Sequence, residues 1–148
     1  MLPEILKKLF ARDLIKLREE ISLYKNENTI WLTDKEIANS AGNLCLHLVG
    51  NLNTYIGATL GNTGYIRNRE LEFSLKNIPK NEILKKIDDT ITVIETTLEH
   101  TSDDQLAGEY PVLVFEHTTT TGYLLVHLAT HLGYHLGQVN YHRRLLDN

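Results

Sequence analysis

The sequence predicts an all-α protein, a four-helix bundle with two long connectors. Apolar residues recur at spacings of three and four in four separate stretches, which is the period of an amphipathic helix. The segments 62–79 and 101–121 lack this period and are expected to connect the helices. Helices with one apolar stripe each are stable when their stripes share a core. The length of 148 residues suits a single domain, so residues 1–148 are expected to form one.

The first helix is expected over residues 3–25. Its apolar positions share one face, with charged residues between them, and they are Phe10, Leu14, Leu17, Ile21 and Tyr24. The polar segment 25–28 then predicts a turn.

The second helix is expected to begin at a capping box. Thr33 and Glu36 have the spacing at which a hydroxyl and a carboxylate each accept from the other residue's amide. The apolar stripe that follows is Ile37, Ala41, Leu44, Leu48, Leu52 and Tyr55, and the helix should end between Gly57 and Gly61.

The third and fourth helices are expected over residues 80–99 and 119–146. The stripe of the third is Leu84, Ile87, Ile91, Ile94 and Leu98. The connector before it contains a charged cluster, Arg67–Phe73, and in the connector after it the segment Tyr110–Phe115 could form a short strand.

Composition excludes several classes of protein. Acidic residues number 19 and basic residues 15, so the net charge of −4 argues against a nucleic acid as partner. No apolar run approaches the ~20 residues of a membrane span, and the N-terminus does not resemble a signal peptide. A lone cysteine, Cys45, cannot form an internal disulfide. We therefore expect a cytoplasmic protein.

Histidines dominate the predicted fourth helix. Of seven in the chain, four lie there: His127, His131, His135 and His142. The i, i+4 pair of His131 and His135 can bind one divalent ion, whereas His127 is rotated outward and is a weaker candidate. His142, beside two arginines in the last turn, is placed to interact with the helix dipole.

A third ligand must come from another helix, and His47 is the only histidine of the second one. Three imidazoles suit Zn, Ni, Fe or Mn and leave coordination positions open. Two alternatives remain: a half-buried polar seam, or histidines that line a subunit interface. Arg67 and Arg69 are expected to pair with Glu70, Glu72 or other carboxylates, or else to bind an anion near the site.

The residues 131–138, HLGYHLGQ, resemble the HxxxHxGQ signature of the DinB-like (damage-inducible protein B) superfamily. His47 is similar to that family's first ligand, and the Arg67–Phe73 segment resembles a connector motif of one subfamily. The match covers about residues 5–146. The resemblance implies an up-down-down-up bundle, often a homodimer, with zinc or nickel held by His47, His131 and His135.

The resemblance also implies a class of activity. Characterised members are thiol-dependent S-transferases and isomerases that use low-molecular-weight thiols such as bacillithiol or mycothiol, and they are not DNA enzymes. The first hypothesis is therefore a metal-dependent transferase or hydrolase with a small-molecule substrate, in which Gln138 binds a ligand or supports His135. The alternative is a non-catalytic metal-binding or assembly module.

Overall fold

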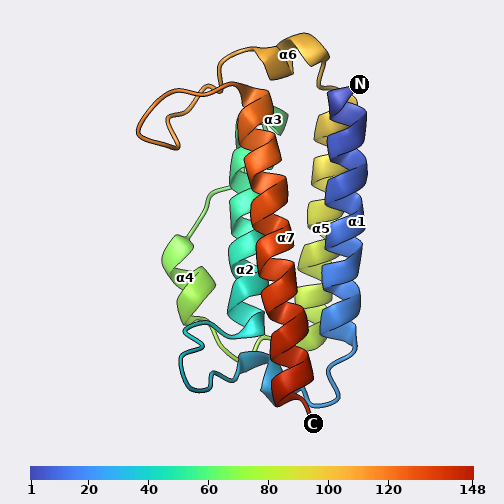
Figure 1. The fold of residues 1–148 in the computed structure, drawn as a ribbon, viewed down its shortest axis with the longest axis vertical. Coiled ribbons are helices and arrows are strands. Elements are labelled where there is room, and N and C mark those ends of the chain that lie inside the picture. The colour runs from blue at the N-terminus through green and yellow to red at the C-terminus, as the bar shows by residue number, and fades with distance from the viewer.

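The computed structural model describes residues 1–148 and confirms the all-α prediction. Four long helical segments form the bundle (Figure 1): α1 (Leu2–Ser22), α2 (Ala41–Leu52), α5 (Lys80–Glu99) and α7 (Thr121–Leu146). A π-helical turn, η2 (Asn53–Ala58), and a last turn, α3 (Thr59–Gly61), extend α2 to the predicted end, where Asn62 adopts a left-handed conformation. Three short helices lie in the connectors: η1 (Glu27–Trp31), α4 (Arg69–Ser74) and α6 (Asp103–Ala107).

The long helices run down, up, up and down in chain order (Figure 1). The first helix, α1, packs against α5 and α7, and α2 packs against the same two helices. This is the arrangement that the family resemblance implies. Because α2 and α7 are antiparallel neighbours, residues near the middle of one face residues near the middle of the other.

The core is one cluster of 27 buried apolar residues along the facing stripes of the helices. Full burial of a Leu, Ile or Phe side chain contributes about 1.5–3 kcal/mol relative to leaving it exposed. The stripe of α5 is rotated from the predicted one, because Ile83 and Thr90 are buried while Leu84 and Ile91 are only partly so. No helix in the protein has the combination of length and hydrophobicity that a transmembrane span requires.

The predicted start of the second helix is wrong. Thr33 and Glu36 lie in an exposed loop, and α2 begins eight residues after Thr33, with Ser40 as its N-cap. The Ser40 hydroxyl accepts from the Asn43 amide and donates to the Asn43 side chain at 2.6 Å, so this cap satisfies groups that are buried and have no access to water, unlike those at the exposed Thr33. Trp31 packs directly on Gly42, which fixes the loop at the start of α2.

The predicted strand is also absent. Residues 110–115 are irregular, and the only β pairing in this connector is an isolated bridge between Glu109 and Thr120. Tyr110 is nevertheless anchored, because it is buried and donates its hydroxyl to the Tyr55 carbonyl at 2.6 Å.

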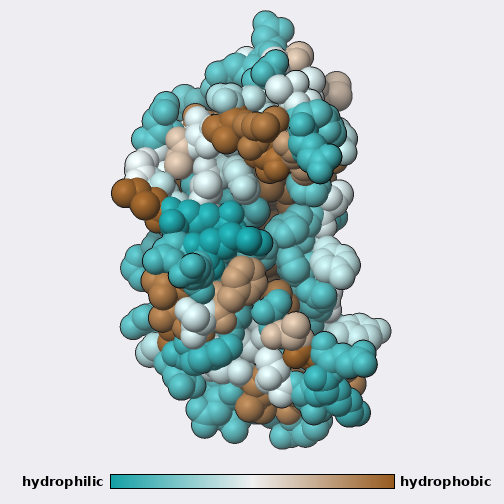
Figure 2. Space-filling model, turned by 90° about the vertical axis from the view of Figure 1, so that its left-hand side faces the viewer, coloured by the Kyte–Doolittle hydropathy of each residue, from teal (hydrophilic) through white to brown (hydrophobic).

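The connector between α3 and α5 covers the outer side of α2. Asn43 holds it there, because its side-chain amide donates to the carbonyls of Glu72 and Leu75, each at 2.9 Å. With the bundle on one side and α4 on the other, every residue of α2 is buried. The face that carries α4 shows a strongly hydrophilic band at mid-height, between apolar patches above and below it (Figure 2).

Candidate metal centre

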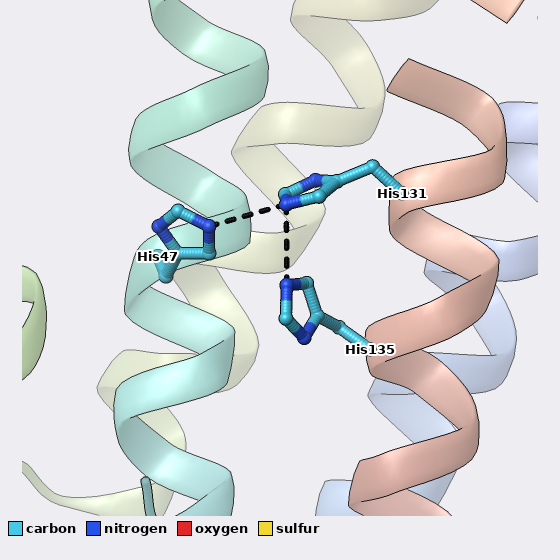
Figure 3. Close-up of side chains that lie close together, drawn as sticks. All are labelled: His47, His131 and His135. Atoms are coloured by element: carbon cyan, nitrogen blue, oxygen red, sulfur yellow. Dashed lines mark hydrogen bonds between the residues drawn. The ribbon is translucent and has the colours of Figure 1, made fainter. Parts of the chain in front are cut away.

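Three imidazoles from α2 and α7 converge in the middle of the bundle (Figure 3). The Nε2 atom of His131 lies 3.3 Å from Nε2 of His47 and 3.1 Å from Nε2 of His135. His131 and His135 are one turn apart on α7, and the antiparallel α2 brings His47 to the same level. The three ligand atoms all lie within 4.8 Å of one another, so the structure brings together the three residues that the sequence singled out.

Two of these rings are oriented from outside the cluster. His47 donates from Nδ1 to Oε1 of Glu72 at 3.1 Å, and His135 donates from Nδ1 to Oε1 of Gln138 at 2.7 Å. When the Nδ1 atom of a neutral imidazole carries the proton, Nε2 presents a lone pair. Both Nε2 lone pairs therefore face the third ring, and Gln138 occupies the supporting position expected of it.

The third ring, His131, cannot supply an N–H donor to both of its Nε2 contacts in this cluster. Burial lowers its pKa to about 4, so it is neutral at pH 7, and burial also lowers the pKa of His47. When all three rings are neutral, at most one proton is available for the two contacts between Nε2 atoms, and Nδ1 of His131 is buried without a partner. Lone pairs that face one another repel unless a cation lies between them. The donor set consequently fits a divalent ion that accepts imidazole nitrogen.

Glu72 and Arg67 complete the support of His47. The guanidinium binds the carboxylate through two bonds, from Nε to Oε2 at 2.8 Å and from Nη2 to Oε1 at 2.9 Å. Such bidentate pairs are stronger and more directional than single charged contacts. The expected pairing with a nearby carboxylate is thus present for Arg67, whereas for Arg69 it is wrong, because that guanidinium lies over the ring of Phe73 instead. The contact of Glu72 with His47 was not foreseen, because 25 residues separate them and no spacing rule links a connector to a helix.

A glycine makes room for this carboxylate. A Cβ atom built on Gly50 would lie 1.9 Å from Oε2 of Glu72, far closer than a carbon atom can approach an oxygen to which it is not bonded. Gly50 stands one turn after His47, so the bare backbone of α2 there lets Glu72 reach the imidazole. The contact between Glu72 and His47 therefore requires a glycine at position 50, because any side chain there would displace the carboxylate.

Two cavities flank the centre. The basic cavity, of about 330 Å³, is lined by His47 and His131 and extends to Asn51, Tyr55 and Arg69. The apolar cavity, of about 550 Å³, borders His135 and Gln138 on the other side, and its remaining lining includes Ile37, Leu44, Tyr134, Tyr141 and Leu145. Both volumes lie in the range of small-molecule pockets. Residues 36–39, expected to begin a helix, form part of the wall of the apolar cavity.

The cysteine stands apart from the cluster, whereas His127 lies beside it, with its ring stacked on that of His131 at 6.4 Å, but is not one of the three convergent residues. His127 is exposed and packs edge-on against Phe115 at 5.0 Å, in agreement with its lower ranking as a ligand. Cys45 is fully buried, and loss of solvation raises the pKa of its thiol, which makes it a poor ligand or nucleophile.

His142 differs from its expectation. It is buried, accepts from the Tyr24 hydroxyl at 2.6 Å and donates to the Leu32 carbonyl at 2.8 Å. Burial lowers its pKa, so the ring ties α1, the following loop and α7 together as a neutral group rather than as a charge on the helix dipole.

The fold and the cluster define a class: a helical bundle with three histidines convergent between two antiparallel helices. The chain belongs to the family described as "Protein of unknown function (DUF1572)", whose sequence model matches residues 7–148. No curated protein matches the sequence.

Proposed function

We propose that the protein is a divalent-metal-dependent enzyme of the DinB-like superfamily, with His47, His131 and His135 as the ligands. Zinc and nickel are the preferred ions, because both accept neutral imidazole readily, and iron and manganese are alternatives. The observation that carries the proposal is the convergence of three Nε2 atoms that share at most one proton. The HLGYHLGQ segment and the order of the four helices support membership of the superfamily.

An enzyme accounts for the surroundings better than a closed structural site does. Structural zinc sites usually have four protein ligands, often cysteine, whereas three protein ligands leave a position for a small molecule. Cavities reach the ligand residues from two sides, and their volumes suit a substrate and a cosubstrate. An ion held there would lower the pKa of a thiol or water bound to it and so supply a nucleophile at neutral pH.

The reaction we propose is the addition of a low-molecular-weight thiol to an electrophile, or a related hydrolysis. The chain's own part in it is to hold the three rings. The Glu72–Arg67 pair fixes His47, and Gln138 fixes His135. Apolar side chains of the second cavity, such as Leu44 and Tyr134, would exclude water from a substrate that enters from that side.

The first test is metal content. Elemental analysis of protein purified without a histidine tag should give about one zinc or nickel ion per chain, and His47→Ala and His131→Ala should each abolish tight binding. His100→Ala is the matched control, since His100 is exposed and bonds only to the carbonyl of Thr96 in its own helix. Equal metal content in all four proteins would contradict the proposed ligands.

The second test is turnover. The metal-loaded protein should transfer a thiol from a panel that includes bacillithiol and mycothiol to a small electrophile, and His131→Ala should be inactive. Turnover by His131→Ala equal to that of the wild type would eliminate the proposed enzyme.

A non-catalytic metal-binding or assembly module remains the second candidate. It is favoured by one observation: the ligands come from segments 84 residues apart, so an ion would also cross-link α2 to α7. This module predicts metal binding and a large loss of stability on chelation, without turnover of any thiol.

A further inference from the structure

Arg69 is a cation without a counter-ion beside the histidine cluster. Its guanidinium lies over the ring of Phe73 at 5.7 Å, and the Phe73 ring lies 5.1 Å from the ring of His47. The neighbouring Arg67 also lines the basic cavity but binds Glu72 through Nε and Nη2, whereas no carboxylate pairs with Arg69. The stack on Phe73 therefore holds a free positive charge close to the cluster.

The basic cavity into which Arg69 extends has no acidic lining residue. The nearest buried carboxylate, Glu72, is neutralised by its two bonds to Arg67 and does not oppose an anion. The hydrophilic band in Figure 2 crosses the face that carries α4, on which Arg69 lies. The charge around this cavity is therefore positive, and a divalent ion on the histidines would increase it.

Asn51 supplies a second, independent indication of a ligand. Its side chain lines the basic cavity, it is only 8% exposed, and its Oδ1 has no hydrogen-bond partner. A buried acceptor without a partner costs free energy, so a native protein with such a group calls for a partner that the chain itself does not supply, such as a ligand or an ordered water. An anionic oxygen only accepts hydrogen bonds, so Asn51 would serve it by donating from its side-chain N–H groups.

We propose that the basic cavity binds the anionic oxygen group, a carboxylate or a phosphate, of a small substrate. Arg69 supplies the charge and Asn51 a hydrogen bond, and the uncharged part of the molecule extends toward His47 and His131. This proposal names the substrate class of the proposed enzyme. It rests on the proposed function only in that the bound anion is taken to be the substrate of a reaction. The volume of about 330 Å³ limits the ligand to a small molecule.

Calorimetry with benzoate, phenyl phosphate and the neutral benzamide tests this proposal on zinc-loaded full-length protein. At least one of the two anions should bind more tightly than benzamide. The ratio of the dissociation constants of benzoate and phenyl phosphate distinguishes a carboxylate site from a phosphate site. Arg69→Gln should weaken that anion about 10- to 100-fold, the loss expected for a charge-assisted hydrogen bond. Arg69→Lys should weaken it less, and Asn51→Leu should weaken it several-fold.

Arg144→Gln is the matched control, because Arg144 is also exposed and stacked on an aromatic ring, 5.6 Å from Tyr141, but lies outside the cavity. It should bind the anion like the wild type. Equal affinity of wild type and Arg69→Gln would overturn the proposal, since an anion bound only to the metal would not respond to this change. Failure of both anions to bind the wild type would overturn it as well.

The same titrations on metal-free protein separate this proposal from the proposed enzyme. Anion binding that depends on Arg69 in a protein with no affinity for zinc or nickel would support the cavity as an anion site and refute the metal enzyme. Tight zinc binding, together with equal anion affinity of the wild type and Arg69→Gln, would support the metal centre and refute the anion site.

Discussion

Among the residues outside the three histidines, Glu72 has the largest effect on the geometry of the cluster. Its carboxylate is buried, accepts from Nδ1 of His47 at Oε1 and accepts from Arg67 at both oxygens. A carboxylate behind a ligating imidazole fixes the tautomer of the ring and increases its basicity. Arg67 in turn prevents a buried, uncompensated charge.

Glu72→Gln should therefore weaken metal binding about 10- to 100-fold without abolishing it, because the amide keeps the shape but not the charge. Competition with a chromophoric chelator measures the affinity. Glu70→Gln is the control, since Glu70 lies in the same short helix, is exposed and has no partner at the centre. An affinity of Glu72→Gln equal to the wild-type value would show that Glu72 only anchors the connector.

Histidines whose pKa values are lowered in the folded protein make the metal-free protein sensitive to acid. Burial lowers the pKa of His131 from 6.5 to about 4 and also lowers that of His142. Between about pH 6.5 and pH 4 the unfolded chain binds protons that the folded chain does not, so the free energy of unfolding falls as the pH falls through this window.

Urea unfolding of metal-free protein from about pH 7.5 to about pH 4.5 should show this loss, and His131→Ala should reduce it. His100→Ala, which removes an exposed ring, should keep the wild-type dependence. A pH dependence identical in wild type and His131→Ala would contradict a lowered pKa of His131 in the folded protein.

The three histidines could be predicted from the sequence because each carries a positional signal. His131 and His135 share a helix face, and His47 is alone in its helix. Glu72 and Asn51 carry no such signal. Their roles depend on where a connector and a helix turn come to lie, which only the packed structure determines.

At the scale of elements, α2 is the helix that sequence reasoning described least well. The predicted fourth helix begins and ends within two residues of α7, and the predicted third helix coincides with α5. Both lie between connectors without helical periodicity, which marks their ends. The capping-box pattern at Thr33 was misleading because a local pattern cannot register the buried alternative at Ser40. The short α4 and α6 lack a stripe long enough to be detected.

Gly50→Ala tests the close approach of α4 to α2. The added methyl group would displace the Glu72 carboxylate, so the variant should lose about 1–3 kcal/mol of stability and bind metal more weakly. Thermal unfolding and chelator competition measure the two effects. Gly137→Ala, where nothing lies within 4 Å of the new atom, should instead stabilise α7 by up to about 1 kcal/mol. Destabilisation by both variants alike would point to a general intolerance of the bundle.

At the scale of the whole molecule, metal binding and stability should be coupled. An ion that binds only the folded protein, at a free concentration 100 times its Kd, stabilises the fold by about 2.7 kcal/mol. The Tm should therefore rise with added zinc or nickel and fall on chelation. His135→Ala should remove this dependence while it retains the fold, because His135 lies at the edge of the cluster and is only partly buried. A wild-type Tm that stays the same with and without added zinc or nickel would contradict ion binding to the native state.

The distance along the chain between His47 and the α7 pair has a consequence for biosynthesis. The donor set cannot exist on the ribosome until α7 has emerged and docked against α2, long after α2 itself is made. Ion uptake would then be a late step of maturation, and a nascent chain short of α7 would have no means to capture an ion from the cell's supply at this centre.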